Sequence, residues 1–535
     1  MIERIIIKNY KCIKDADIKF NAFKNIIVGN NGVGKSTLME ALSLALGYGL
    51  NKFEITPHIF NIECIRNFSA TKELPEILIE VYFSKEYGET SGENNSLHVH
   101  KSGLYFKVSF NEQYEEIYYE ELKKNETPHI PCEYYKIERM WFSQKPVVYY
   151  KMPFIVQIVD SSSLYFSSSS NQYINQLIER HLGQDDTTAI KTSLRHLKEA
   201  FDQDCEISNV NQKINQKKPG LSLSIDLTSR IEKRDIVCPF LDDIPVSQTG
   251  SGEIGMLKTI LALSNGENNT KPKVVIIEEP ETHLSHTKMY ELLRIIERLL
   301  DEQNTQVLIT THNSFIANKL NLSNLIMLER MDYKLIERKL ENGDNAYDFF
   351  SKVSHYPTLR MILSKAIILV EGPADEMIVT YYYYKHCEKK HPFNDGIELI
   401  VVGGVAFKEY ISLVKEFNKK VAVITDNDGK PYEYLLKRTG LEVLPENIKL
   451  FTEDDRELKT LEPSFVNANI GNLQDLSNYL RLNKCPNDTK DALVDYMENH
   501  KTTWSFRLLQ NIDCVDFVVP SYISDAVDWI VGCNC

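Results

Sequence analysis

Nine consecutive residues near the amino terminus constrain the fold more than any other part of the chain. The segment GNNGVGKST (residues 29–37) fits the pattern G-x-x-x-x-G-K-[ST], follows the short apolar run NIIV and precedes a helical pattern that starts at Ser36. A strand, a glycine-rich loop and a helix in this order point backbone N–H groups at a phosphate, next to a helix N-terminus. We therefore expect an α/β nucleotide-binding domain here, and not a chance glycine-rich turn.

This loop supplies the residues expected to bind ATP and one Mg²⁺ ion. Its glycines let the backbone turn toward the phosphates, Lys35 would neutralise the β- and γ-phosphates, and the Ser36 hydroxyl would ligate Mg²⁺. The residues assigned to the nucleotide are Asn30, Asn31, Gly32, Gly34, Lys35, Ser36 and Thr37.

Three segments far downstream have the composition of the other half of such a site. VVIIEEPETHL (residues 274–284) is an apolar strand that ends in two acids, of which Glu278 would hold Mg²⁺ through water and Glu279 would polarise the attacking water. QTGSGE (residues 248–253) is a Gly–Ser turn that opens a helix, and VLITTHNSF (residues 307–315) is a strand that ends in His312. An acid pair or a lone histidine is weak by itself, but the order of all four segments is specific.

The order of phosphate loop, Gly–Ser turn, acid pair and histidine resembles the ABC-type ATPase heads of SMC and RecF proteins. The resemblance implies that Gly250, Ser251 and Gly252 form a signature turn that closes on the ATP of a second subunit, and that His312 is the switch histidine. It therefore implies a homodimer or a higher homo-oligomer. The turn departs from the transporter sequence LSGGQ, and Glu278 stands where many relatives carry Asp.

A second group of acids follows predicted strands in the last third of the chain. VEGPADE (residues 370–376) places Glu371 at the tip of one strand and Asp375 in the first turn of the next helix, and TDND (residues 425–428) ends another strand. Asp426 and Asp428 are two residues apart, so in an extended chain both point to one side. Acids gathered at strand tips of a parallel sheet would repel one another without a cation.

We therefore expect Glu371, Asp375, Asp426 and Asp428 to bind Mg²⁺ or Mn²⁺. Two such ions about 4 Å apart can activate water and stabilise the leaving oxygen of a phosphodiester. The alternative is that the acids only cap helices and end strands, which suits Asp375 best, because an acid in a first helical turn is favourable.

The Glu…Asp-x-Asp arrangement over three βα units resembles the Toprim domain, and its place directly after an ABC head resembles the OLD (overcoming lysogenization defect) family. Gly403 and Gly404 after the second strand fit this resemblance, as does the tail VPSYISDAVDWI. The resemblance implies that Glu462 in TLEPSF is a further metal-site acid, and that Lys501 in HKTTWSF stabilises charge on the phosphate and, with Glu371, is catalytic. Asp375 stands where many relatives carry Glu, and Glu376 follows it, so either of the two can be the ligand.

The fold class expected is α/β. An ABC-type head carries a helical insertion and precedes a Toprim parallel-sheet domain with C-terminal helices. The expected limits are residues 1–165 and 241–357 for the head, 166–240 for the insertion, and 358–535 for the Toprim domain with its helices. In OLD proteins the insertion is a dimerisation element, although a plain surface hairpin is the alternative.

Composition limits the protein classes that remain. The chain has 535 residues, which predicts roughly three domains, and its net charge of −14 argues against a protein that coats DNA by bulk attraction. The ten cysteines are scattered, which is typical of reduced thiols, with zinc at Cys533 and Cys535 as a weak alternative. The chain starts with no signal-peptide pattern and has no apolar run of about 18 residues, so we expect a cytoplasmic protein without a membrane partner.

The OLD resemblance implies an ATP-regulated, metal-dependent DNA endonuclease in anti-phage defence. Some relatives act beside a UvrD-like helicase, as in Gabija, or beside a retron reverse transcriptase with its msDNA. The alternative is a RecF- or SMC-like ATP-driven clamp on DNA without nuclease activity. A topoisomerase would need a nucleophilic tyrosine, and the run of tyrosines at residues 381–384 lies within a predicted helix and more simply serves packing.

Overall fold

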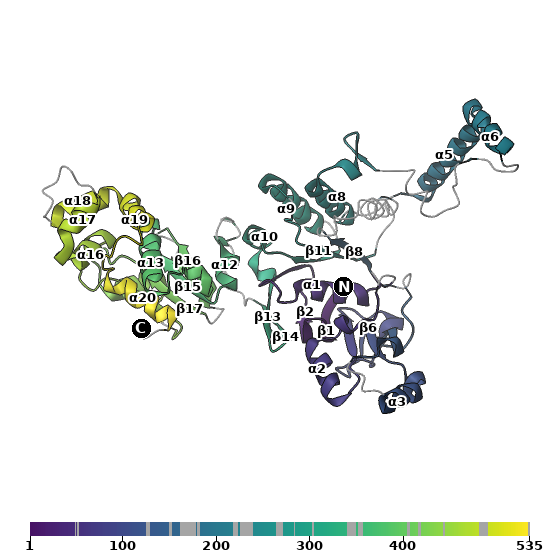
Figure 1. Ribbon diagram of the computed structural model, residues 1–535, viewed down its shortest axis with the longest axis horizontal. Coiled ribbons are helices and arrows are strands. Elements are labelled where there is room, and N and C mark those ends of the chain that lie inside the picture. Colours follow the sequence, from purple (N-terminus) through teal and green to yellow (C-terminus); the bar gives the residue numbers. More distant parts are fainter. Residues whose placement is uncertain are drawn as a thin grey trace. The chain divides into compact units, whose positions relative to one another are not determined.

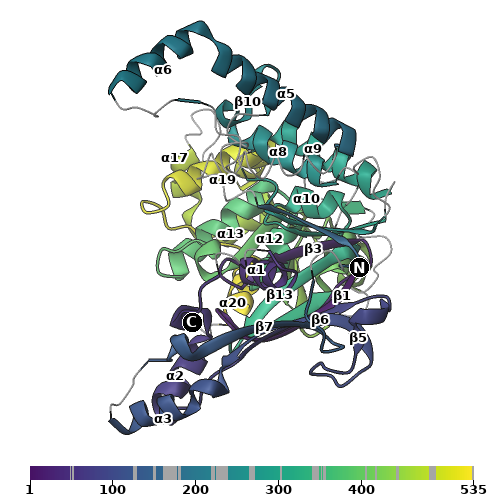
Figure 2. The ribbon, with the colours of Figure 1, turned by 90° about the vertical axis from the view of Figure 1, so that its right-hand side faces the viewer.

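The computed structural model divides the chain into two compact units, which Figures 1 and 2 show as ribbons. The first unit contains residues 1–316 and 324–339, and the second contains residues 317–323 and 340–535. Within these limits the structure describes residues 1–48, 50, 53–124, 129–148, 152–160, 178, 182–217, 223–224, 239–263, 271–282, 284–301, 304–339, 349–350, 352, 357–403, 407–415, 419–441, 445–480 and 490–532. Gly404, Cys533, Cys535 and the expected start of the insertion at residues 166–177 lie outside them.

One large sheet forms the centre of the first unit. Its strands run in the order β5 (Ser91–Gly92), β6 (Lys101–Phe110), β4 (Ile77–Phe83), β1 (Ile2–Tyr10), β2 (Ile13–Lys19), β14 (Lys334–Lys339), β13 (Leu325–Met331), β3 (Lys24–Gly29), β12 (Thr305–Thr310), β11 (Lys273–Glu278) and β8 (Ile155–Asp160), with β7 (Tyr135–Trp141) beside β6. The strands from β13 to β8 are mutually parallel and read as almost continuous apolar runs, because both faces of a parallel sheet are covered.

Helices cover this parallel part on both faces. They include α1 (Lys35–Ala45), α8 (Ser251–Leu263) and α9 (His286–Asp301). The other helices described before residue 320 are α2 (Ile62–Thr71), α3 (Glu115–Lys124), α5 (Gln184–Gln203), α6 (Cys205–Lys217) and α10 (Ser314–Lys319), and a small ribbon of β9 (Phe240–Leu241) and β10 (Ile244–Pro245) precedes α8. Figures 1 and 2 show α1 on one side of the parallel strands and α8 and α9 on the other. The helices α5 and α6 follow each other directly within the expected insertion, joined at Asp204.

The second unit contains a four-stranded parallel sheet in the order β16 (Ile397–Val401), β15 (Ala366–Val370), β17 (Lys420–Ile424), β18 (Ile448–Phe451). The helices are α12 (Thr358–Leu363), α13 (Pro373–His386), α14 (Phe407–Val414), α15 (Tyr432–Thr439), α16 (Leu461–Ala468), α17 (Leu473–Leu480), α18 (Lys490–Asn499), α19 (Lys501–Gln510) and α20 (Ser521–Val531). The expected α/β fold class is confirmed in both units: a mixed sheet with helices in the first, then a parallel sheet with C-terminal helices in the second.

Both faces of the second sheet are buried, because successive residues of its short strands point to opposite faces and are mostly apolar. Ile368 and Val370 belong to the core that includes α13 and α20, and the intervening Ile367 and Leu369, which point the opposite way, are equally buried. The polar residues that follow each strand are therefore concentrated at its carboxyl end, at the edge of the sheet.

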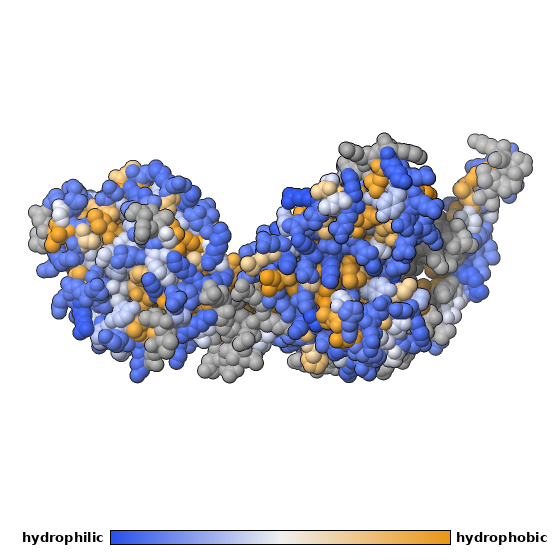
Figure 3. All heavy atoms as spheres, turned by 90° about the horizontal axis from the view of Figure 1, so that it is seen from below, coloured by the Kyte–Doolittle hydropathy of each residue, from blue (hydrophilic) through white to orange (hydrophobic). Residues whose placement is uncertain are grey.

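The described helices include none that is both long enough and apolar enough to cross a membrane. Hydrophilic residues predominate on the face of the molecule drawn in Figure 3, and apolar residues there form small groups.

Candidate functional site

The phosphate loop has the backbone shape that its glycines allow. Gly32 and Gly34 have φ angles of +73° and +122°, a region that side chains disfavour, and α1 begins at Lys35. The Lys35 ammonium lies 2.8 Å from the carbonyl oxygen of Gly29 and 3.2 Å from that of Asn30. Burial lowers the pKa of Lys35, while the nearby carboxylates of Glu279 and Glu281 raise it. The acids that follow β11 therefore lie close enough to Lys35 to affect its charge.

The sheet brings the distant segments of this site together. The parallel register pairs Glu278 with Thr310 and Thr310 with Ile27, so the acid pair, His312 and the phosphate loop all follow the carboxyl ends of neighbouring strands. The Glu279 carboxylate lies 3.4 Å from Nε2 of His312. Asn31, Ser36 and Thr37 lie in or directly after the same loop, next to Lys35.

The Gly–Ser turn does open a helix, because α8 begins at Ser251 and the amide of Ile254 donates to the carbonyl of Gly250. The helix packs on β8 and β11, two strands away from β3 and its phosphate loop. It stays a prediction that Gly250, Ser251 and Gly252 contact the ATP of a second subunit.

Glu281 is a residue of this site that the sequence reasoning missed. Its Oε1 accepts hydrogen bonds from the Thr311 hydroxyl and from the backbone amide of His312, both at 2.8 Å. The carboxylate therefore fixes the segment that carries the histidine. The only signal in the sequence was its place in EEPETHL, two residues after Glu279.

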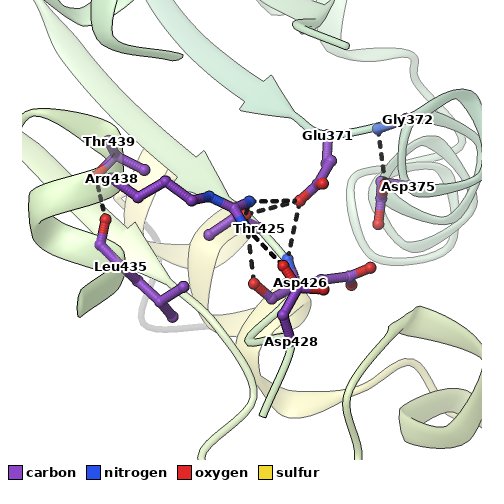
Figure 4. Close-up of polar contacts among 9 residues, drawn as sticks. All are labelled: Glu371, Gly372, Asp375, Thr425, Asp426, Asp428, Leu435, Arg438 and Thr439. Carbon is purple, nitrogen blue, oxygen red and sulfur yellow. Dashed lines mark hydrogen bonds and ion pairs between the residues drawn. The ribbon is translucent and has the colours of Figure 1, made fainter. Parts of the chain in front are cut away.

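In the second unit the expected acids gather at one edge of the parallel sheet (Figure 4). Val370 pairs with Ile424, so Glu371 follows β15 at the same level at which Thr425 follows β17. Glu371 Oε2 accepts hydrogen bonds from the Thr425 hydroxyl at 2.8 Å and from the Asp426 amide at 3.4 Å. The strand tips thus bring Glu371 and Asp426, which are far apart in sequence, into one place.

Asp375 and Glu462 join this group from the first turns of α13 and α16. Asp375 is 8% exposed and accepts a hydrogen bond of 2.9 Å from the Gly372 amide, so it does cap α13 as the alternative interpretation expected. Its pKa is affected by Glu371 and Glu462, whereas that of Glu376 is affected by Arg360, which places the two neighbouring acids in different surroundings. Glu462 is 2% exposed and accepts a hydrogen bond from the Thr460 hydroxyl.

Asp428 does not lie in extended chain as its spacing from Asp426 suggested. It has a φ of +50° in a turn, because Asn427 is buried and its side chain donates to the carbonyls of Glu453 and Asp455. The turn still leaves the Asp428 carboxylate near the group, bridged to it by an arginine described below.

The crowding of buried acids raises two of their pKa values. Burial, and then the neighbouring acids, raise the pKa of Asp426 to about 8. Burial and the charges of Glu371 and Glu462 raise the pKa of Asp375 to about 7. Tyr522 of α20, buried beside these acids, has a pKa well above its ordinary value because of burial and the Asp426 charge. A raised pKa means that these carboxyl groups ionise less readily when they lie together. A divalent cation would stabilise their ionised form, so this set of oxygen atoms fits a divalent metal ion.

Within the part of the chain that the structure describes, no group of three or more acids, histidines or cysteines is arranged to hold an ion as it stands. A cationic side chain already lies between two of the acids. Arg438, which the sequence reasoning also missed, donates from Nη1 to Asp428 at 2.6 Å and from Nη2 to Glu371 at 3.1 Å (Figure 4).

Lys501 is exposed and is the first residue of α19. Ser505, one turn later, contacts Met377 of α13, and Asp513 pairs with Lys389 just beyond α13. The two helices therefore run side by side in the same direction, and Lys501 lies toward the end of α13 that carries Asp375.

The four tyrosines of α13 have structural partners. Tyr381 hydrogen-bonds to the backbone of Val515 and Phe517, and Tyr382, Tyr383 and Tyr384 donate to Asp528, Asp395 and Asp513. Three of the hydroxyl groups tie α13 to the C-terminal segments and that of Tyr383 ties it to the turn before β16, which is the packing role expected of them.

Comparison with known proteins assigns both units. A family model described as the AAA ATPase domain matches residues 1–317, and one described as "Overcoming lysogenization defect protein-like, TOPRIM domain" matches residues 362–428. Endonuclease GajA of Bacillus cereus (strain VD045) is 22% identical over 98% of this chain and 94% of its own length. The OLD nuclease of Thermus scotoductus (strain ATCC 700910 / SA-01) is 23% identical over 81% of this chain and 83% of its own length.

Among solved structures, the C-terminal region of the Burkholderia pseudomallei OLD protein covers 32% of this chain, with 98% of its own length, 23% identity and a TM-score of 0.24. The two family matches account for most of the chain between them and occur in the order that the motifs predicted. The chain therefore belongs to the AAA ATPase domain family, and its second unit contains an OLD-like TOPRIM domain.

Proposed function

We propose that this protein is an ATP-regulated, divalent-metal-dependent DNA endonuclease of the OLD type. The observation that carries the proposal is the group of acids at the carboxyl edge of the Toprim sheet, where the buried Asp375 and Glu462 and the partly buried Asp426 lie near Glu371. Burial of several carboxylates in one place is unfavourable unless they serve a cation. The relatives named endonuclease and nuclease make a phosphodiester of DNA the substrate that fits best.

The residues that would hold the metal are Glu371, Asp375, Asp426, Asp428 and Glu462. Two Mg²⁺ or Mn²⁺ ions bound there would activate water and stabilise the leaving oxygen of the phosphodiester. Asp375 is the better candidate of the two neighbouring acids, because it faces Glu371 and Glu462 while Glu376 faces Arg360. Lys501 would contact the phosphate and stabilise its charge, and the Thr425 hydroxyl holds Glu371 in position.

In the head, Lys35 and the loop amides would bind the phosphates of ATP, while Ser36 and Glu278 would hold its Mg²⁺. Glu279 would orient the attacking water, and His312, fixed by Glu281, would contact the γ-phosphate. The signature turn at residues 250–252 would complete this site in a second subunit. ATP would then act on DNA cleavage by changing how two heads meet.

A homodimer is part of this proposal, and the α5–α6 segment is its proposed contact. Along α5 the apolar residues Ile190, Leu194, Leu197 and Phe201 recur at helical spacing, and Ile190 and Leu197 are 39% and 51% exposed. A contiguous exposed apolar stripe of this kind suits a second copy of the same helix better than solvent.

An anti-phage role in the cytoplasm, with a UvrD-like helicase or a retron reverse transcriptase and its msDNA as partner, stays a prediction. Purification from cells that carry the neighbouring genes, followed by identification of proteins and nucleic acid that co-purify, would test it.

The test of the nuclease is cleavage of plasmid DNA by the purified protein with Mg²⁺ or Mn²⁺, with and without ATP. Glu371→Ala and Asp426→Ala should each lower the rate by more than about 100-fold, since each removes a direct metal ligand. Glu457→Ala, which removes an exposed acid of the same unit, is the matched control and should cut like the wild type. Cleavage that survives both substitutions would mean that another site cuts DNA.

Intact plasmid and intact single strands under every condition, together with ATP-dependent DNA binding, would favour the RecF- or SMC-like clamp instead.

A further inference from the structure

Arg438 occupies a place in the Toprim site that neither its motifs nor the family match assigns. It lies on the eight-residue helix α15, whose end is fixed by the buried Thr439 and by Gly440 in the left-handed conformation. From there its guanidinium donates 2.6 Å to Asp428 Oδ2, 3.1 Å to Glu371 Oε2 and 2.9 Å to the Thr425 hydroxyl. Figure 4 shows the guanidinium pointing between the two strand tips.

The carboxylate oxygens that this arginine contacts are those expected to ligate metal. Glu371 and Asp428 come from different segments, so a single fork-shaped cation holds both of them at once. The Arg438 side chain is 25% exposed and that of Glu371 27%, so water screens the pair only in part. A divalent ion bound to the same oxygens would meet a permanent positive charge next to it.

The arginine is not fully satisfied in this arrangement. Its Nε is buried and has no hydrogen-bond partner among the described residues, although the two Nη groups are paired. A buried N–H group without an acceptor is unfavourable, so this position does not satisfy every donor of the guanidinium. The incomplete pairing suits a side chain that has a second position in the working site.

We propose that Arg438 is a built-in counter-cation of the nuclease centre, which neutralises Glu371 and Asp428 in the metal-free protein and competes with the divalent ion for them. It holds the two acids in place before metal arrives and releases at least one of them when metal binds. Arginine keeps its charge at every physiological pH, so this competition does not depend on its protonation. The inference rests on the proposed function, because it concerns the same metal site.

The test is Mn²⁺ binding by the full-length, nucleotide-free protein, measured by isothermal titration calorimetry. Arg438→Gln removes the competing charge and should bind Mn²⁺ roughly tenfold more tightly than the wild type, given the size of charge interactions at this distance near a protein surface. Arg438→Lys keeps a charge that cannot bridge both acids and should fall between the two. Lys437→Gln removes the same charge from the neighbouring exposed residue and should match the wild type.

A second readout is the melting temperature with EDTA and with Mn²⁺. Arg438→Gln should melt lower than the wild type in EDTA, because Glu371 and Asp428 then repel each other, and should gain more from added Mn²⁺. An affinity of Arg438→Gln that is equal to or below the wild-type value would overturn the inference. If that variant does not fold, the same result with Arg438→Lys would overturn it.

Asp426→Asn separates this inference from the proposed function, because Arg438 does not contact the Asp426 side chain in any described hydrogen bond. Wild-type Mn²⁺ binding that survives this substitution would refute the metal site itself, whatever Arg438 does. Loss of binding in Asp426→Asn with unchanged affinity in Arg438→Gln would refute only the role of Arg438.

Discussion

At the scale of single residues, both candidate centres contain a side chain on a left-handed backbone. Glu279 has a φ of +43° and Asp428 a φ of +50°, a conformation that residues other than glycine adopt uncommonly. Aspartate tolerates this region better than glutamate, because its short side chain can hydrogen-bond locally. Strain of this kind persists only where the surroundings fix it, and at both centres it aims a carboxylate that the proposed chemistry uses.

Glu281 gives a prediction at the same scale. Glu281→Ala removes the acceptor that holds the Thr311 hydroxyl and the His312 amide, so ATP hydrolysis should fall about 10- to 100-fold while ATP affinity stays within about twofold. Phosphate release and binding of a fluorescent nucleotide measure the two quantities. Thr311→Val removes only one of the two hydrogen bonds and should have the smaller effect. Equal losses of affinity and hydrolysis would show that Glu281 acts in binding.

At the scale of elements, the packing of α19 depends on one large buried side chain, that of Trp504. Trp504 is fully buried and its ring centroid lies 5.0 Å from that of Phe465 in α16, so this contact fixes the helix that begins at Lys501. Trp504→Ala should destabilise the second unit by about 3–5 kcal/mol, the usual cost of removing a buried aromatic side chain. Urea unfolding followed by circular dichroism measures it.

The matched control lies on the same helix. Phe506 is 50% exposed, so Phe506→Ala should change the stability by less than about 0.5 kcal/mol. Similar losses for the two variants would mean that α19 contributes through its whole length and not through Trp504.

The helix α5 gives a second prediction for elements. Leu197→Asp places a charge in the exposed apolar stripe and should shift the protein from dimer to monomer in light scattering coupled to size-exclusion chromatography, because an unpaired charge in an apolar contact is unfavourable. His196→Asp, at the neighbouring exposed position outside the stripe, should leave the dimer intact. A Leu197→Asp protein that stays dimeric would place the subunit contact elsewhere.

At the scale of the whole molecule, one chain joins a nucleotide site to a nuclease site. If ATP regulates cleavage by binding at the head, loss of that binding should abolish its effect, since a ligand shifts an equilibrium only through differential binding. Lys35→Ala removes the buried ammonium that would contact the phosphates, so the ratio of cleavage rates with and without ATP should become about one. Plasmid assays at several ATP concentrations measure this ratio.

Lys19→Ala, an exposed lysine of the same unit, should keep the wild-type response to ATP. A Lys35→Ala protein that still responds would show that ATP acts through another site or by binding the metal ions in solution.

The sequence by itself determined the parts of this protein that depend on neighbouring residues. Apolar runs of β-branched residues specify strands such as β3, β11, β15 and β17, and the glycines of the phosphate loop are required by backbone angles that only they adopt easily. Acids placed directly after such strands meet at one sheet edge, because parallel strands end at the same level. The fold class and the family follow from these local patterns.

Only the tertiary structure decided which distant groups share a hydrogen bond. Glu281 and His312 are 31 residues apart and Arg438 and Glu371 are 67 apart, and no sequence spacing relates them. The turn that carries Asp428 is set by the partners of Asn427, and the raised pKa values of Asp375 and Asp426 come from burial by elements far along the chain. Burial and charge pairing depend on the packed whole, so they appear only when the elements are assembled.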